Sequence, residues 1–169
     1  MPRVLGIDPS LTSTGLAVID DGVVTDLVRV RTGSTGHERV QDIVDAIAEA
    51  AGDPTTLVGI EGTAMHAKGS SVVQIFGLWG VITHALWFAG FPYYVVPPAT
   101  RCRYATGKGN SPKDQVLAAV IKRYGDVEVV GNDEADALII AAMGARHAGQ
   151  PIEASLPETH LKAMEGVQW

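Results

Sequence analysis

Apolar runs separated by turn residues organise the chain from its first positions. Five of these runs are typical of short β-strands, at residues 4–8, 15–19, 23–30, 56–62 and 91–98. The Asp20-Asp21-Gly22 corner between the second and third runs is a strong hairpin signal. The chain is therefore expected to open with three antiparallel strands.

Apolar residues at intervals of three and four positions predict helices between and after these strands. Four segments show this spacing, at residues 38–51, 70–89, 111–124 and 132–149. Ser111, followed by Pro112, is the expected N-cap of the third helix, and Asn132 is that of the fourth. The segment from Ala99 to Asn110 is predicted to be a loop.

The order of the predicted elements is β-β-β-α-β-α-β-α-α. Three antiparallel strands followed by alternating helices and strands predict an α/β fold, with a mixed central sheet and helices on both faces. At 169 residues the chain fits one domain with a substantial core. We assign this domain to residues 1–149 and treat residues 150–169 as a C-terminal tail with one short helix at most.

Composition narrows the class of protein. Hydrophobic residues make up 46% of the chain and charged residues 19%, which is typical of a globular protein in water. No apolar run reaches the roughly 18 residues of a membrane span, and Asp8 interrupts what would be the apolar part of a secretory signal. Cys102 is the single cysteine, which excludes an intramolecular disulfide and a cysteine zinc site. We expect a cytoplasmic protein with no membrane partner.

The net charge of the chain is −6, but its basic residues are concentrated in one segment. Six Lys and Arg residues and one acid, Asp114, lie between Arg101 and Arg123, so this segment carries +5. Such a segment is either a solvated helix face or a surface for nucleic-acid phosphates. The count alone does not decide between the two.

Four acidic residues lie at positions typical of a catalytic or ligand-binding site. Asp8 follows the strand VLGI and Glu61 follows LVGI, so each lies at a strand end, where ligands bind in open α/β sheets. Asp133 and Asp136 are three positions apart on a predicted helix and share its apolar face. Taken singly, Asp133 is also typical of a helix N-terminus, and Asp8 of a turn before Pro9.

As a group, four such acids need a cation. Carboxylates about 4 Å apart would repel each other by several kcal/mol, and a divalent ion removes that repulsion. Sites made of carboxylate oxygens suit Mg²⁺ or Mn²⁺. Two such ions about 4 Å apart activate water and stabilise the leaving oxygen of a phosphodiester. The acids therefore indicate metal-dependent phosphodiester hydrolysis.

These motifs, in this order, resemble the RuvC family of Holliday junction resolvases in the RNase H-like nuclease superfamily. The resemblance spans about residues 3–148 and rests on GIDPS…TG at the start of the chain, IEG, TGKGNSPKDQV and NDEADAL. It implies an RNase H-like fold. It also maps four residues onto the family's catalytic acids, which bind two Mg²⁺, with Mn²⁺ as a substitute: Asp8, Glu61, Asp133 and Asp136.

The same resemblance implies the substrate and the assembly. Family members are homodimers that nick two opposed strands of a four-way junction symmetrically, and the helix from Ser70 to Ala89 would be the dimer element. Lys113 falls where the family has a lysine near the scissile phosphate, and Lys108 lies in the glycine-flanked loop beside it. Where a second family lysine is expected this chain has Cys102, so the DNA-binding role passes to its neighbours Arg101 and Arg103.

The loop after Glu61 departs from the family pattern. Some members place an aromatic wedge there, whereas GTAMHAKGSS has no aromatic ring beyond a histidine. Candidate DNA contacts in this loop are Met65, His66 and Lys68. A flexible loop without a role fits equally well, which leaves junction selectivity open. Lys122 and Arg123, late in their helix, are expected to be solvated.

Two alternatives accompany the resolvase interpretation. The same fold and acids would serve a nuclease for forks, flaps or RNA–DNA hybrids. A protein that binds junctions without cutting them would be expected to lack at least one of the four acids, and all are present. The sequence leaves open whether its host is a bacterium or a bacteriophage.

Overall fold

A computed structural model describes residues 3–63 and 71–169. A single five-stranded sheet forms its centre, with the spatial order β3-β2-β1-β4-β5. The strands are β1 (Val4–Asp8), β2 (Thr14–Asp20), β3 (Val23–Val30), β4 (Leu57–Glu61) and β5 (Tyr93–Val96). β1 pairs antiparallel with β2 and parallel with β4, and β4 pairs parallel with β5. The mixed sheet predicted from the sequence is confirmed.

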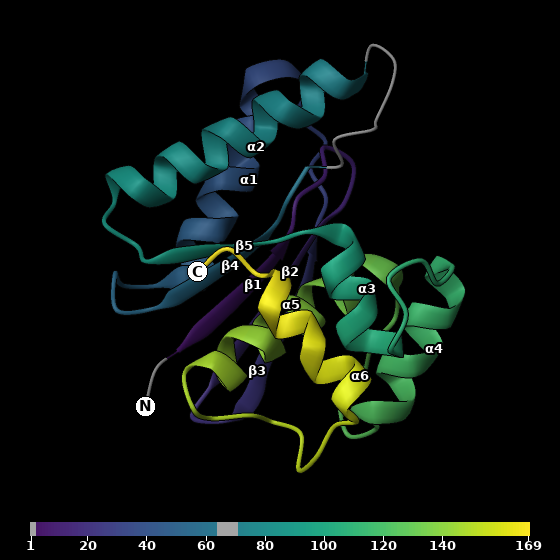
Figure 1. The fold of residues 1–169 in the computed structure, drawn as a ribbon. Helices are drawn as coiled ribbons and strands as arrows, with labels where there is room; N and C mark the ends of the chain where they lie inside the picture. Colours follow the sequence, from purple (N-terminus) through teal and green to yellow (C-terminus); the bar gives the residue numbers. More distant parts are fainter. Residues whose placement is uncertain (1–2, 64–70) are drawn as a thin grey trace.

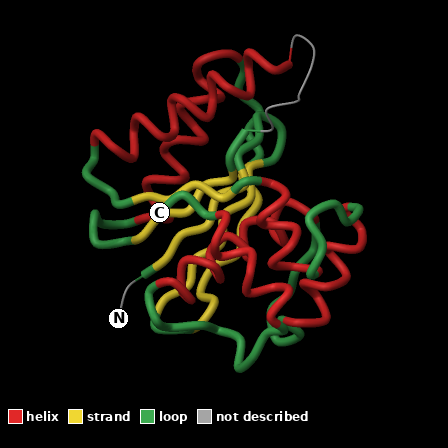
Figure 2. Tube along the Cα trace, in the orientation of Figure 1, coloured by secondary structure: helices red, strands yellow, loops and turns green. Residues whose placement is uncertain are grey.

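Helices cover both faces of this sheet, as predicted (Figure 1). One face carries α1 (Gly36–Ala51) and α2 (Ser71–Phe88). The other carries α5 (Asn132–His147), with α3 (Pro98–Thr106), α4 (Lys113–Arg123) and α6 (Glu158–Leu161) beyond it. The tube view shows the same two helical layers on either side of the strands (Figure 2).

Strand alternation decides which side chains meet which layer, because successive residues of a strand point to opposite faces. Leu5 and Ile7 of β1, with Val58 and Ile60 of β4, belong to the core under α1 and α2. Val4 belongs to the opposite core, under α5. Asp8 is four residues on from Val4, so the alternation directs it to the α5 side.

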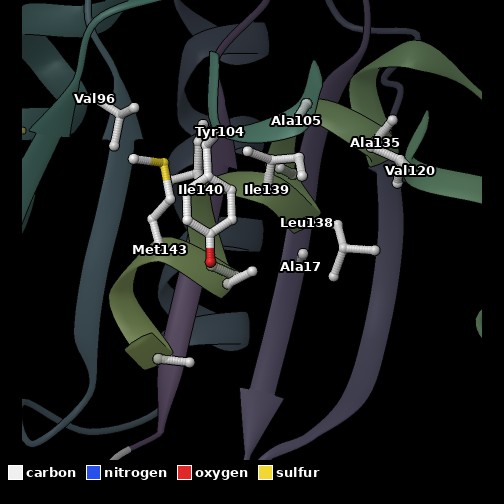
Figure 3. Packing of buried hydrophobic residues seen from close by; sticks show 14 of the residues in the cluster. Ala17, Val96, Tyr104, Ala105, Val120, Ala135, Leu138, Ile139, Ile140 and Met143 are labelled. Atoms are coloured by element: carbon white, nitrogen blue, oxygen red, sulfur yellow. The ribbon is translucent and has the colours of Figure 1, made fainter. Parts of the chain in front are cut away.

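The core on the α5 side is built around a helix that is buried along nearly its whole length. It also takes residues from β2, β5, α3 and α4 (Figure 3). The labelled side chains are Ala17, Val96, Tyr104, Ala105, Val120, Ala135, Leu138, Ile139, Ile140 and Met143. Because both ends of α5 are fixed by this packing, the polar residues of its first turns are held in place over the sheet.

α3 corrects the prediction of a loop between Ala99 and Asn110. Pro98 occupies its first turn, where a proline is well tolerated. Its buried residues are Arg101, Cys102, Tyr104 and Ala105, a set with no clear apolar period. The sequence pattern failed here because the most important inward residue is an arginine, whose partners come from other elements.

Two predicted helix caps are wrong. α4 begins at Lys113 with Pro112 at the N-cap, while the Ser111 hydroxyl pairs with Thr106 Oγ1 at 2.9 Å. α5 has Gly131 at its N-cap. Oε2 of Glu134 accepts the backbone N–H groups of Val130 at 2.6 Å and Gly131 at 3.2 Å, as the N3 glutamate of a capping box does, and Asn132 is the first residue of the helix.

The C-terminal segment packs against the rest of the fold. It contains α6, the short helix allowed for from the sequence, followed by a 3₁₀ turn at Lys162–Gly166. Gln168 exchanges two backbone hydrogen bonds of 3.0 Å with Val95, which covers the open edge of β5. The ring of Trp169 stacks on His147 with centroids 3.7 Å apart. Among the described helices, none has the length and apolar character needed to span a membrane.

Candidate active site

Asp8 and Glu61 lie at the same edge of the sheet. β1 and β4 are adjacent and parallel, with Gly6 opposite Gly59 and Ile7 opposite Ile60. Asp8 and Glu61 are the next residue on each strand, so both carboxylates emerge at the carboxyl ends of parallel neighbours. This is where open α/β sheets place ligands, as the sequence predicted.

Two glycines let α5 approach closely enough to add its acids. A Cβ on Gly15 would lie 2.0 Å from the carbonyl oxygen of Asp133, and a Cβ on Gly6 would lie 2.2 Å from that of Ala137. Any side chain at either position would push α5 off the sheet. This role was not predicted from the sequence, although Gly6 and Gly15 both belong to the motifs that open the chain.

The four acids meet in one cluster. Burial raises the pKa of Asp8 well above its ordinary value, and the nearby charges of Glu61 and Asp136 raise it further. Burial likewise raises the pKa of Asp136 to about 6, with Glu61 and Asp133 adding to the effect. Asp8 therefore lies near Glu61 and Asp136, and Asp136 lies near Glu61 and Asp133.

Arg101 lies inside this cluster. Its side chain extends from α3, and the residue is only 8% exposed. Nε donates to Oε1 of Glu61 at 2.5 Å, and Nη1 donates to Oδ1 of Asp136. Burial opposes the charge of the guanidinium, but the adjacent acids outweigh it and raise the pKa of Arg101. The cluster thus contains its own counter-ion.

The donor set fits a hard divalent cation, because it consists of carboxylate oxygens from four residues. Within residues 3–63 and 71–169, however, no three acidic, His or Cys side chains are arranged as a ready-made metal site. The carboxylates of Glu61 and Asp136 instead face the guanidinium of Arg101. Metal binding at these acids would require Arg101 to release at least one of them.

Comparison with known proteins identifies the family. The profile described as RuvC, crossover junction endodeoxyribonuclease, matches residues 4–144. The chain belongs to the RuvC family. A protein named crossover junction endodeoxyribonuclease RuvC from Halorhodospira halophila is 30% identical over 161 residues, covering 92% of this chain and 96% of the relative. One of the same name from Rhodopirellula baltica is 31% identical, covering 90% and 91%.

Solved structures agree with this RuvC assignment. Thermus thermophilus RuvC, in complex with Holliday junction substrate, has a TM-score of 0.72 and 25% identity, covering 89% of this chain and 98% of its own. The yeast mitochondrial Holliday junction resolvase has a TM-score of 0.55 at 13% identity, covering 83% of this chain and 76% of its own, a likeness of fold alone. The RNase H-like fold expected from the sequence is confirmed.

The basic candidates of this RuvC-family chain separate into two environments. Lys113, the first residue of α4, lies near enough to Asp136 for its charge to offset part of the rise in the pKa of that carboxyl. Arg103 and Lys108 are exposed on α3 and on the loop that follows it. Arg101 is instead buried among the acids. Met65, His66 and Lys68 lie outside the described residues.

Arg123 corrects one expectation and Trp79 adds a contact that the sequence did not indicate. Arg123 is half-buried and donates to the carbonyl oxygens of Tyr104 and Ala105, so it is not simply solvated. Lys122 is exposed, as expected.

Nε1 of Trp79 on α2 donates to the carbonyl oxygen of Glu61 at 3.1 Å. This bond ties α2 to the strand end that carries a cluster acid.

Proposed function

We propose that this protein is a structure-selective DNA endonuclease that resolves four-way (Holliday) junctions by paired, metal-dependent nicks. The observation that carries the proposal is the cluster of Asp8, Glu61, Asp133 and Asp136 in a chain of the RuvC family. The relatives are named crossover junction endodeoxyribonucleases. The similar RuvC of Thermus thermophilus was solved in complex with Holliday junction substrate.

RuvC proteins are metal-dependent nucleases. For this chain we assign two Mg²⁺ ions to the four acids, with Mn²⁺ as a substitute. Ions bound there supply the positive charge that activates water and stabilises the leaving oxygen. The donor chemistry supports Mg²⁺, because carboxylate oxygens without His or Cys are typical of its sites.

The residues around the acids have complementary tasks. Lys113, at the N-terminus of α4 and close to Asp136, would contact the phosphate that reaches the acids. Arg101 pairs with both Glu61 and Asp136 and would hold these two acids close to each other. The exposed side chains of Arg103 and Lys108 would contact flanking phosphates. Met65, His66 and Lys68 remain candidates for contacts at the branch point.

Two nicks in opposed strands require two active sites, and α2 offers the surface to pair them. Apolar side chains on this helix are exposed, with Phe88 at 80% and Val73 at 77%. Gly77 and Gly80 are exposed too, and they would let a second backbone approach closely. We therefore assign homodimerisation to the helix predicted at Ser70–Ala89. Since the relatives are bacterial proteins, we place the chain in the bacterial cytoplasm, with a phage-encoded origin left open.

The first experiment compares cleavage of a four-way junction, a three-way fork, a 5′ flap and linear duplex, with Mg²⁺ and with EDTA. Paired symmetric nicks confined to the junction and lost in EDTA are the expected result. Asp8→Asn should bind the junction with unchanged affinity and fail to cut it. Equal cutting of forks and flaps would replace the resolvase with a general branched-DNA nuclease. If the wild type binds the junction without cutting it, the protein is a junction-binding protein and not a nuclease.

A further inference from the structure

A second basic feature lies outside the acid cluster. An open groove of about 470 Å³ runs between the end of α3, the loop after it, α4 and the C-terminal segment. Four basic side chains line it, and among its described lining residues none is acidic. The basic ones are Lys108, Lys122, Arg123 and His160.

Arg123 lines this groove, and hydrogen bonds fix the position of its guanidinium. Nη1 donates to the carbonyl oxygen of Tyr104 at 3.0 Å, and Nη2 donates to that of Ala105 at 2.7 Å. Both carbonyls belong to the last turn of α3, which favours a cation there. A guanidinium has five N–H donors, so these bonds orient Arg123 without using all of them. A side chain fixed in this way loses little entropy when it binds an anion.

His160 brings the C-terminal segment to the same groove. Its Nδ1 lies 2.8 Å from the carbonyl oxygen of Tyr104 and 3.0 Å from Nη2 of Arg123. The other side of the ring faces the loop after α3, because a Cβ on Gly107 would lie 3.2 Å from Nε2. The family profile ends at residue 144, so this wall of the groove comes from beyond the matched segment.

The loop between α3 and α4 joins this groove to the acid cluster. Lys108 at one end of the loop lines the groove, and Lys113 at the other end lies beside Asp136. Lys122 is nine residues further along α4, or about 13 Å at 1.5 Å per residue. Along duplex DNA this length corresponds to roughly four base pairs. A duplex arm leaving the acids is thus long enough to reach the groove.

We propose that this groove binds the backbone phosphates of a junction arm, a few base pairs from the cleaved bond. This inference rests on the proposed junction substrate and adds a contact site to it. The groove favours a polyanion over a small anion because it is open and its two lysines are exposed at the rim. The C-terminal segment thereby gains a role as one wall of a DNA-binding surface.

The test measures binding of a four-way junction by the uncleaving Asp8→Asn protein over a range of salt concentrations. Lys122→Ala should raise Kd about fivefold at 0.1 M salt and lower the slope of log Kd against log salt by about 0.9. His160→Ala should also weaken binding, with its melting temperature recorded to separate lost contacts from lost folding. Lys162→Ala is the matched control, because Lys162 is an exposed lysine of the same segment, paired with Glu158 outside the groove. It should change neither Kd nor slope.

The outcomes separate this inference from the proposed function. If Lys122→Ala leaves Kd and slope unchanged while the parent binds the junction tightly, the groove does not bind DNA. The proposed resolvase activity would then still stand. If the parent binds inorganic phosphate at the groove while Lys122→Ala binds the junction normally, the groove is a small-anion site and the DNA assignment is wrong. Failure of the parent to bind any junction would overturn both proposals.

Discussion

The Nε atom of Arg101 donates a hydrogen bond to Oε1 of Glu61 across 2.5 Å, deep within the acid cluster. Arginine at this position neutralises charge that a divalent cation would otherwise neutralise. The carboxylate of Glu61 cannot bind both Arg101 and a divalent cation fully at the same time. Arg101 is therefore expected to stabilise the metal-free protein and to compete with metal binding.

Replacing Arg101 with an uncharged side chain of similar length tests this competition. Arg101→Met should lower the free energy of unfolding in EDTA by about 3 kcal/mol, because it leaves buried carboxylates without a partner. The same variant should bind Mn²⁺ about tenfold more tightly. Denaturation in EDTA and titration with Mn²⁺ measure the two effects. Arg103→Met, the exposed neighbour, should change neither, and an unaltered Arg101→Met protein would show that the ion pairs do not hold the cluster in solution.

The pKa of Asp136, about 6 against an ordinary 3.8, predicts how stability depends on pH. Between these values the folded metal-free protein keeps a proton that the unfolded chain releases. The free energy of unfolding should therefore fall as the pH rises from about 4 to 6, by up to about 3 kcal/mol from Asp136 alone. Asp8, whose pKa is also raised, adds to this fall in the same direction. Asp42 and Asp53, whose pKa values are lowered, change stability in the opposite sense at lower pH.

Urea denaturation in EDTA at several pH values between 4.5 and 7.5 measures this dependence. Saturating Mg²⁺ should reverse the loss at neutral pH, and its apparent affinity should drop below pH 6 as protons compete for the carboxylates. Asp136→Asn should make the fall smaller and leave the part that comes from Asp8. A wild-type protein that becomes steadily more stable from pH 4.5 to 7 without metal would contradict the assignment.

Gly15 is predicted to be indispensable for the placement of Asp133. Gly15→Ala would put a methyl group 2.0 Å from a backbone oxygen of α5, so the helix has to shift away from β2. We expect a loss of about 1–3 kcal/mol in stability. The relative loss of cleavage should be larger, because Asp133 moves with the helix. Gly33→Ala, where an added Cβ meets nothing within 4 Å, is the matched control. Melting temperature and junction cleavage of both variants decide the matter.

The exposed apolar side of α2 predicts the oligomeric state. Sedimentation should give the wild type a mass of twice 17.8 kDa. Val81→Glu, on the part of α2 that carries Gly77 and Gly80, should weaken the dimer by at least about tenfold, because it buries a charge in an apolar interface. Val23→Glu, at another exposed valine on β3, should leave the dimer intact. A monomeric wild type, or a dimeric Val81→Glu protein, would exclude α2 as the interface.

Much of the fold was predictable because its strands and helices carry strong local signals. β1 and β3 have the predicted bounds, and α1, α2 and α5 differ from prediction by a few residues at their ends. α3 was missed because it buries Arg101 and Tyr104 rather than a stripe of aliphatic residues. A helix of nine residues whose buried positions mix an arginine with a tyrosine, a cysteine and an alanine has no clear hydrophobic period, and only its partners across the fold reveal it.

The sequence by itself determined that Asp8 and Glu61 each end a strand and that Asp133 and Asp136 share a helix face, since both facts follow from the periods of strand and helix. Only the tertiary structure decided how these acids are neutralised. It turned Arg101 inward as their counter-ion, seated α5 against Gly6 and Gly15, and brought His160 beside Arg123, 37 positions away in the chain. These contacts depend on packing between elements distant in sequence, and no local pattern encodes such distances.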